Sequence, residues 1–320
     1  QGGAASSRSA PAPAAAVRRV GRWVAGGGHA AMAPGPGNPD LRWSVEEIKN
    51  TPSRGDGVPD RDERVERFAA CNFARNLTRA IFNNDRQQED NSNRVQILAC
   101  YYLQLFFMFR SLRQEEAETV AVAATFLACK VVDLPRKIRG ILRSLNQLRV
   151  QAGEPELVED DQQRLSASVL RIEFQLLRII RFEFDLVLPL DFVATLTEAL
   201  LVQLTRCEVF KNACKNTPQQ EASELRNQLL RVSENFVLDS FMGFAPLLAQ
   251  PRVIAAGALA IATRYIRREM AIPELCGLLN NADASLPAEK VRHVVDEILN
   301  VFRTKSLAGS ATAAGGAAGG

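Results

Sequence analysis

The sequence predicts an all-α protein with two bundles of five helices each. Apolar residues recur at steps of three and four along most of the chain, as they do on one face of a helix, and almost no segment alternates as a strand does. The chain has 320 residues, of which 47% are hydrophobic. A single core stops growing beyond roughly 250 residues, so two cores are expected.

A short helix opens the predicted fold. Ser44 and Glu47 have the spacing of a capping box, and Pro52 requires this helix to end before it. Residues 1–39 are Ala, Gly, Pro and Ser with scattered arginines, and we expect them to be disordered. Met32 offers a plausible start, so the segment before it is not expected to act as a targeting peptide.

Two sets of helices follow, separated by gaps that hold Gly, Pro, Asn or Asp. The first set is predicted at 60–82, 93–109, 115–131, 135–148 and 160–182, and the second at 191–204, 221–244, 251–266, 273–279 and 288–303. We expect the first domain to span residues 40–187 and the second 188–305. Residues 306–320 are rich in Ala and Gly and are expected to form a disordered tail.

The third helix of each set is the most apolar. Residues 124–130 align with residues 258–264 at an offset of 134. A helix that is apolar on every side must lie at the centre of its bundle. The sequence therefore predicts a duplicated domain with a central helix in each copy.

Composition excludes several functions. Lys and Arg number 39 and Asp and Glu 36, so a net charge of +3 favours neither nucleic acid nor a membrane surface as partner. No apolar stretch reaches the roughly 18 residues of a membrane span. The six cysteines form no C-x-x-C pair, and four lie in apolar runs, as reduced thiols do in the cytosol or nucleus. The only histidines, His29 and His293, are poorly placed for zinc.

No motif in the sequence indicates catalysis. Neither a Gly-rich phosphate loop nor a nucleophile motif is present, so we expect no enzyme, no cofactor and no metal. Two charged residues stand out instead. Lys130 ends the third helix, where a cation suits the helix dipole. Glu173 falls at the edge of the apolar stripe of the fifth helix, where an acid needs a partner.

Four segments resemble cyclins. Residues 126–139 read Phe-Leu-Ala-Cys-Lys-Val-Val-Asp-Leu-Pro-Arg-Lys-Ile-Arg, similar to the core of a cyclin box, in which a helix of small residues ends in Lys. Residues 43–58 resemble the opening segment of cyclins K and T, and residues 169–182 resemble their fifth helix. Residues 235–241 with 251–255 resemble their second box. The segments occur in the order of the family, and the resemblance covers about residues 42–304.

The resemblance implies a tandem cyclin fold and a regulatory function. Transcriptional cyclins are not enzymes themselves. They bind and activate the catalytic subunit of a cyclin-dependent kinase in the nucleus, and the complex phosphorylates the repeat tail of RNA polymerase II. In cyclins the Lys that ends helix three and the Glu of helix five contact the kinase, which implies Lys130 and Glu173 here. Ala128, Val131 and Phe182 would supply apolar contacts between them, with burial in the core as the alternative for these three.

This chain departs from the cyclin pattern at several positions. Val132 and Asp133 stand where most cyclins carry two acids. Gln104, Leu105 and Phe106 stand where transcriptional cyclins usually have His-Arg-Phe, so a buried polar pairing is expected to become apolar. The opening segment resembles cyclins K and T, whereas residues 135–139 are nearer to cyclin L.

Two other classes of protein share parts of this pattern. A cell-cycle cyclin is the alternative, but residues 67–71 keep Arg67 and lose the bulky aliphatic residues of the substrate-docking groove, so we expect that groove to be poor. A TFIIB-like general transcription factor would carry a zinc ribbon and a basic DNA-facing surface, and neither is visible. The basic run 136–143 could indicate RNA binding, but a solvated face beside the kinase interface explains it more simply.

Overall fold

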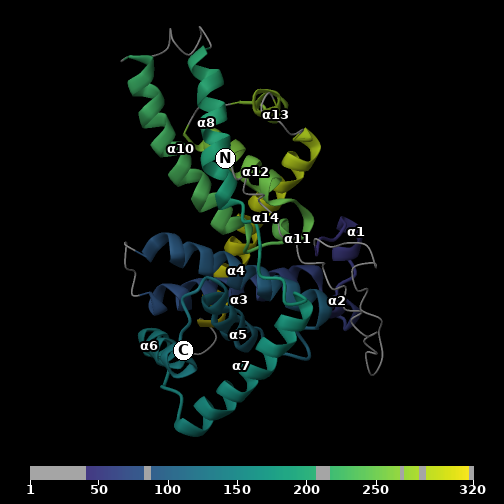
Figure 1. The fold of residues 1–320 in the computed structure, drawn as a ribbon. Coiled ribbons are helices and arrows are strands. Elements are labelled where there is room, and N and C mark those ends of the chain that lie inside the picture. Colours follow the sequence, from purple (N-terminus) through teal and green to yellow (C-terminus); the bar gives the residue numbers. More distant parts are fainter. Residues whose placement is uncertain (1–40, 83–87, 207–216, 267–269, 281–285, 317–320) are drawn as a thin grey trace, which may run out of the picture. The chain divides into compact units, whose positions relative to one another are not determined.

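The computed structural model describes residues 41–82, 88–206, 217–266, 270–280 and 286–316 (Figure 1). Within these ranges the regular elements are helices, and none is a strand. None of these helices is long and apolar enough to cross a membrane. The predicted disordered segment at 1–39 lies outside the described residues, as do Cys207, Cys214 and His29.

The helices fall into two sets, in the order that the sequence predicts. The first set is α1 (Val45–Ile48), α2 (Pro52–Gly55), α3 (Asp60–Ile81), α4 (Glu89–Phe109), α5 (Ala117–Val131), α6 (Ile138–Gln151) and α7 (Glu159–Ile179). The second set is α8 (Leu190–Arg206), α10 (Pro218–Ser240), α11 (Ala245–Leu248), α12 (Pro251–Tyr265), α13 (Ile272–Asn280) and α14 (Ala288–Gly316). The five longer helices of each set correspond to the five predicted ones.

One apolar helix lies at the centre of each bundle. Residues 120–129 of α5 are all buried, and α3, α4, α6 and α7 pack against this helix. Residues 253–263 of α12 are likewise all buried, and α8, α10, α13 and α14 pack against it. Both central helices have 15 residues, and their ends are 134 positions apart, which is the offset of the sequence repeat. The predicted fold of two five-helix bundles around central apolar helices is confirmed.

The segment ahead of the first bundle is built from two short capped helices. The predicted capping box is present, because Ser44 N–H donates to Glu47 Oε2 at 2.7 Å and Glu47 N–H donates to Ser44 Oγ at 3.2 Å. The sequence did not predict α2, which Thr51 caps and which has Pro52 in its first turn. Proline suits that position because it has no N–H to leave unbonded there.

The last helix is longer than predicted. α14 continues through residues 306–316, which the sequence predicts as part of a disordered tail. This stretch contains four alanines, which favour a helix, and three glycines, which disfavour it, so helix propensity alone does not account for the extension. We propose the boundary between the bundles near residue 187, ahead of α8.

A buried ion network joins the opening segment to the first bundle. Glu63 on α3 is fully buried and accepts hydrogen bonds from Thr51 Oγ1 at 2.9 Å, Arg54 Nε at 2.7 Å and Arg67 Nη2 at 2.7 Å. Arg67 also donates to the carbonyl of Phe107 at 2.6 Å. Burial lowers the pKa of Arg67, and the carboxylate of Glu63 opposes that shift, so the guanidinium depends on this partner.

Gln104 completes the surroundings of Arg67. Its Oε1 accepts a hydrogen bond from Arg67 Nη1 at 3.2 Å, and its Nε2 lies 3.6 Å from the sulfur of Cys71. The expectation that the sequence change in helix two makes this pairing apolar is wrong at position 104. The amide takes over the polar role, whereas Leu105 and Phe106 are buried apolar residues.

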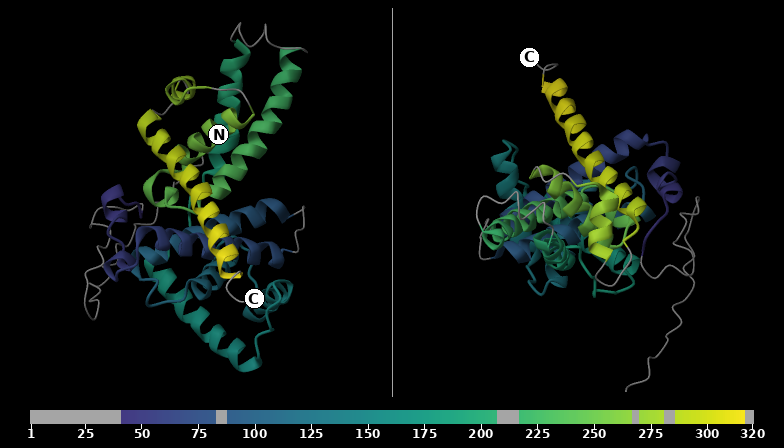
Figure 2. Two further views of the ribbon diagram at one scale, coloured as in Figure 1. Left: turned by 180° about the vertical axis from the view of Figure 1, so that it is seen from behind. Right: turned by 90° about the horizontal axis from the view of Figure 1, so that it is seen from above.

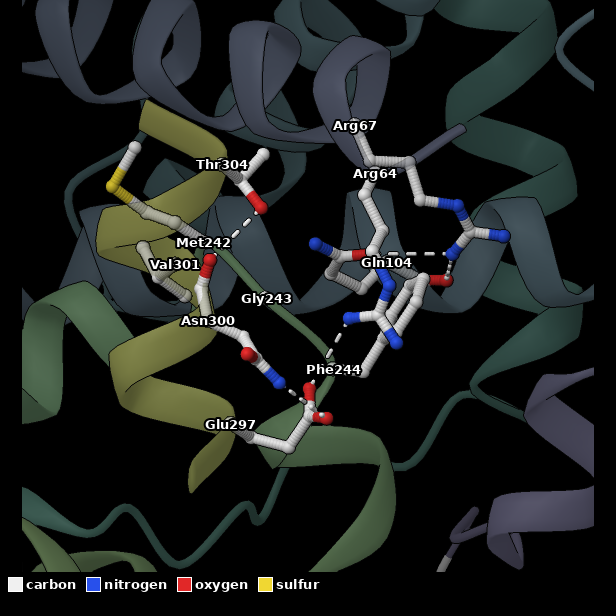
Figure 3. A pocket seen from close by; sticks show the side chains of 10 residues that line it. All are labelled: Arg64, Arg67, Gln104, Met242, Gly243, Phe244, Glu297, Asn300, Val301 and Thr304. Carbon is white, nitrogen blue, oxygen red and sulfur yellow. Dashed lines mark hydrogen bonds and ion pairs between the residues drawn. The ribbon is translucent and has the colours of Figure 1, made fainter. Parts of the chain in front are cut away.

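Contacts between the bundles converge on the same arginine. The Arg67 guanidinium lies over the ring of Phe244 at 5.1 Å, and Arg64 lies over the same ring at 4.6 Å (Figure 3). Arg64 also pairs with Glu297 on α14, at 3.4 Å between Nη1 and Oε2. Figure 2 shows α14, in yellow, running from the second bundle across the first, where it packs on α3. The bundles are therefore joined by charge and ring contacts as well as by apolar packing.

Substitution of Glu63 tests the buried network. Glu63→Gln is expected to lower the free energy of unfolding by about 3–5 kcal/mol, because it leaves the Arg67 charge buried without its counter-charge. Glu198→Gln is the matched control, since Glu198 pairs with Arg226 at the exposed surface of the second bundle, and it should cost less than about 1 kcal/mol. Urea denaturation measures both. Equal losses of unfolding free energy in the two variants would show that the buried network does not depend on the charge of Glu63.

A second prediction concerns close packing in the second bundle. A Cβ on Gly257 would lie 2.6 Å from Cγ1 of Val294, so α12 and α14 approach each other at a position that only glycine fits. Gly257→Ala is expected to lower the free energy of unfolding by about 1–3 kcal/mol. A Cβ on Gly277, within α13, would have no atom within 4 Å, so Gly277→Ala should instead raise it by about 0.5–1 kcal/mol. Thermal unfolding of the two variants decides this point.

Candidate functional site

The structure brings Lys130 and Glu173 together, 43 residues apart in sequence. Lys130 Nζ lies 2.6 Å from Glu173 Oε1, and it also lies over the ring of Phe126, 4.0 Å from its centre. The Lys130 side chain is 40% exposed and that of Glu173 only 10%. Glu173, at the edge of the apolar stripe, thus has the partner that it requires. The pair is accessible to solvent mainly through Lys130.

Among the described residues of the second bundle, this pair has no counterpart. Arg264 lies near the end of α12 at the position equivalent to Lys130, 134 residues later. Arg264 forms no ion pair with a described residue, and the residue 134 positions after Glu173 is Leu307. If the pair were needed to hold the bundle together, the duplicated bundle would need it too. The asymmetry therefore favours a function for Lys130 and Glu173 at the surface.

Both helices that carry the pair end in the same turn. After α5, Asp133 N–H donates to the carbonyl of Lys130 and Leu134 N–H to that of Cys129. After α7, Arg181 N–H donates to the carbonyl of Arg178 and Phe182 N–H to that of Leu177. These are Schellman motifs, which place the residue after the C-cap in the left-handed region.

The turn after α7 is strained. Arg181 and Phe182 have φ of 57° and 58°, a conformation that costs residues other than glycine roughly 1–2 kcal/mol each. Two such residues in succession direct Phe182 outward, where its side chain is 55% exposed. Backbone strain of this kind clusters at functional sites, which supports the prediction that Phe182 contacts a partner.

The other two predicted apolar residues are less accessible. Ala128 is fully buried within α5, which favours a packing role for its side chain. Val131 is partly buried and packs against the core at the end of the same helix. Their contact with a partner stays a prediction, whereas Phe182 has the exposed surface that such a contact needs.

The sequence reasoning missed two exposed residues beside Glu173. Leu170 is 48% exposed and Phe174 is 57% exposed, and both lie on the solvent-facing side of α7 next to the edge that carries Glu173. Further along, Phe184 and Val187 are also exposed. Five of the thirteen exposed large hydrophobic residues in the described part of the chain thus fall within residues 170–187, and such clustering marks an interaction surface. The sequence held a signal for them, because Leu170 and Phe174 are apolar residues that lie outside the apolar stripe of α7 and are therefore expected to be exposed.

Two hollows near the bundle contact are poor ligand sites. The pocket drawn in Figure 3 has about 10 Å³ of free volume, roughly the space of one water. A larger hollow of about 320 Å³ lies between α1, α3 and α14, but Lys49, Arg54, Arg64 and Glu297 along its wall already pair with charged neighbours. Among the described residues, no three His, Cys, Asp or Glu side chains come together as a metal site requires.

Comparison with known proteins identifies relatives. No family model matches the chain. It is 26% identical to cyclin pch1 of Schizosaccharomyces pombe over 68% of this chain and 56% of that protein. It is 27% identical to human cyclin-T1 over 50% of this chain and 22% of that protein, and 23% identical to cyclin-K of Danio rerio over 70% and 45%. The chain spans less than two thirds of the length of each of these relatives.

A solved structure shares the fold. A chain of the yeast RNA Pol II CTD kinase CTDK-1 complex superposes with a TM-score of 0.55 and 18% identity, over 82% of this chain and 73% of that one. The two helical bundles and the charged pair at the surface of the first define a protein with tandem cyclin folds. The relatives are more specific than the fold, because the chain is similar in sequence to the cyclins pch1, T1 and K.

The strained turn after α7 gives a testable prediction. Arg181→Gly is expected to raise the free energy of unfolding by about 1 kcal/mol, because glycine adopts the left-handed conformation without strain and the arginine side chain is exposed. Arg178→Gly, three residues earlier in the helix, should lower it by about 1 kcal/mol. Chemical denaturation separates the two. A loss of stability in both variants would show that the turn is not strained.

Proposed function

We propose that this chain is the regulatory subunit of a cyclin-dependent kinase that phosphorylates the repeat tail of RNA polymerase II in the nucleus. The similarity to cyclins T and K supports this proposal, and so does the shared fold with a subunit of a polymerase tail kinase complex. The chain supplies no catalytic group itself. Its role is to bind the catalytic subunit as a heterodimer and hold it in the active state.

The mechanism is a shift in the kinase equilibrium. A protein kinase is active only when its own Lys to Glu ion pair is closed, and closure depends on the position of one mobile helix. A rigid surface that binds the closed position more tightly than the open one increases the active population. The first bundle offers such a surface, since α5 at its centre is buried along ten consecutive residues and cannot yield.

The observation that carries the proposal is the Lys130 to Glu173 pair. The lysine is held in place by the carboxylate at 2.6 Å and by the Phe126 ring, and two of its three N–H donors remain for a partner. The second oxygen of Glu173 has no hydrogen bond within the described residues. The two side chains can therefore bind backbone groups of the kinase helix with charge-assisted hydrogen bonds, with little loss of side-chain freedom.

The apolar surface beside the pair supplies the remaining contact. Leu170 and Phe174 lie beside Glu173 on α7, and Phe182 follows on the strained turn. Exposed aromatic anchors around a charged centre are the usual composition of a binding hot spot. We propose that these three residues, together with Val131, contact the kinase, and that Ala128 acts through the packing of α5.

The double variant Lys130→Ala/Glu173→Ala tests this function. The full chain is co-expressed with the catalytic subunits of the polymerase tail kinases of the same organism, and complex formation and phosphorylation of tail peptides are measured. The wild-type chain should stimulate one of these kinases. The double variant should bind it at least about 30-fold more weakly, because truncating hot-spot residues costs at least about 2 kcal/mol of binding free energy.

A matched control separates binding from general damage. Glu115→Ala/Arg171→Ala removes a different ion pair, between α7 and the segment ahead of α5, with 2.6 Å between Arg171 Nη1 and Glu115 Oε1. It should leave stimulation unchanged. Equal losses in both double variants would contradict the assignment of the site. A folded chain that binds none of these kinases but activates a cell-division kinase would replace the function with that of a cell-cycle cyclin.

A further inference from the structure

The start of α6 carries a concentrated basic surface that the proposed function does not use. Residues 136–143 contain four cations and no acid, and we call these four residues the α6 basic surface: Arg136, Lys137, Arg139 and Arg143. Lys137, Arg139 and Arg143 are exposed. Arg136 is half-buried, with its guanidinium carbon 5.1 Å from the centre of the Phe82 ring.

The described residues of the chain do not neutralise the charges of this surface. None of the four cations forms an ion pair with a described residue, although many other basic residues do, including Arg54, Arg64 and Arg67. The helix places these charges outward, because Ile141, Leu142 and Leu145 are its buried residues and lie on the other side. These positive charges are thus available to a partner.

The arrangement opposes the stability of the helix. The start of a helix is its positive end, so acids stabilise it and cations destabilise it. α3 and α7 follow this rule with three acids each in their first turns, but α6 has none there. Lys137, at the N-cap, supplies no side-chain hydrogen bond, and Arg139 and Arg143 repel each other at a spacing of four. Folding does not explain these charges, whereas an anionic partner does.

We propose that the α6 basic surface binds a phosphorylated segment of the substrate tail, an inference that rests on the proposed function. A phosphate carries nearly two negative charges and three acceptor oxygens, which suit arginine forks and the first-turn N–H groups of a helix. Gly140 lies between the basic residues, and a Cβ there would have no atom within 4 Å, so a peptide can approach the backbone at this point.

The reaction itself supplies this ligand. A kinase acting on a repeat tail produces phosphorylated repeats that remain joined to repeats not yet modified. A complex that holds one phosphorylated repeat on α6 raises the effective concentration of the next repeat at the kinase. The α6 basic surface would then favour tails that already carry phosphate.

The dimensions of the surface favour a phosphopeptide over a nucleic acid. Eight residues of helix and loop extend about 12 Å, enough for one or two phosphates. Acids follow beyond the other end of α6, at Glu156 and Glu159, and would repel a longer polyanion. Single-stranded nucleic acids also require aromatic side chains for stacking, and α6 itself contains none.

Fluorescence anisotropy with the full chain tests the proposal. The probes are a labelled tail peptide of several repeats with phosphoserine, the same peptide without phosphate, and a single-stranded RNA of similar length. The phosphorylated peptide should bind more tightly than the other two. Arg139→Gln/Arg143→Gln should weaken its binding about tenfold, as the loss of charge-assisted hydrogen bonds implies. Arg231→Gln/Arg292→Gln removes the same charge from exposed positions of the second bundle and should have no such effect.

The outcomes separate this inference from the proposed function. Lys130→Ala/Glu173→Ala should lose stimulation of the kinase and still bind the phosphopeptide. Arg139→Gln/Arg143→Gln should keep stimulation on unphosphorylated peptides and lose the preference for phosphorylated ones. Binding of RNA in place of the phosphopeptide, equal binding of both peptides, or an equal effect of the Arg231→Gln/Arg292→Gln control would each overturn the inference and leave the cyclin function standing.

Discussion

The buried ion pair between Glu63 and Arg67 is the interaction on which the arrangement of this protein depends. A carboxylate and a guanidinium without solvent persist when most of their hydrogen-bonding groups are satisfied. Here Thr51 and Arg54 donate to the carboxylate, and Gln104 and the carbonyl of Phe107 accept from the terminal nitrogens of the guanidinium, so that Arg67 Nε is the group of the pair left without a hydrogen bond. The same guanidinium faces the Phe244 ring of the second bundle. One pair of charges therefore sets the positions of the opening segment, of α3 against α4, and of the two bundles.

The duplicated fold lets structure and function be compared within one chain. The central helices α5 and α12 have equal length and similar burial, so both copies satisfy the same packing requirement. Among the described residues, only the first copy has an acid opposite the terminal cation and two left-handed residues after its last helix. Features that the packing of the bundle does not need are the ones we assign to partner binding.

Much of this could be predicted from the sequence, and the gaps have physical causes. Long amphipathic helices, the central apolar helices and the capping box at Ser44 follow from local periodicity and spacing, so they were predicted closely. α2 was missed because four residues are too few to show a periodicity, and the extension of α14 was missed because its residues form no apolar pattern. Gln104 was expected to end a polar pairing, but its role depends on Arg67 lying across from it on another helix.

The sequence by itself determined the fold class, the repeat and the two charged residues, Lys130 and Glu173, that became candidates for partner binding. Periodicity is a local property, and Lys130 and Glu173 could each be recognised as a charged residue that departs from the apolar pattern of its own helix. Only the tertiary structure decided that these residues meet at 2.6 Å, that Phe182 is exposed while Ala128 is enclosed, and that the four cations of the α6 basic surface form no ion pair with a described residue. Distances and burial arise from the packing of helices far apart in sequence, and no local pattern encodes them.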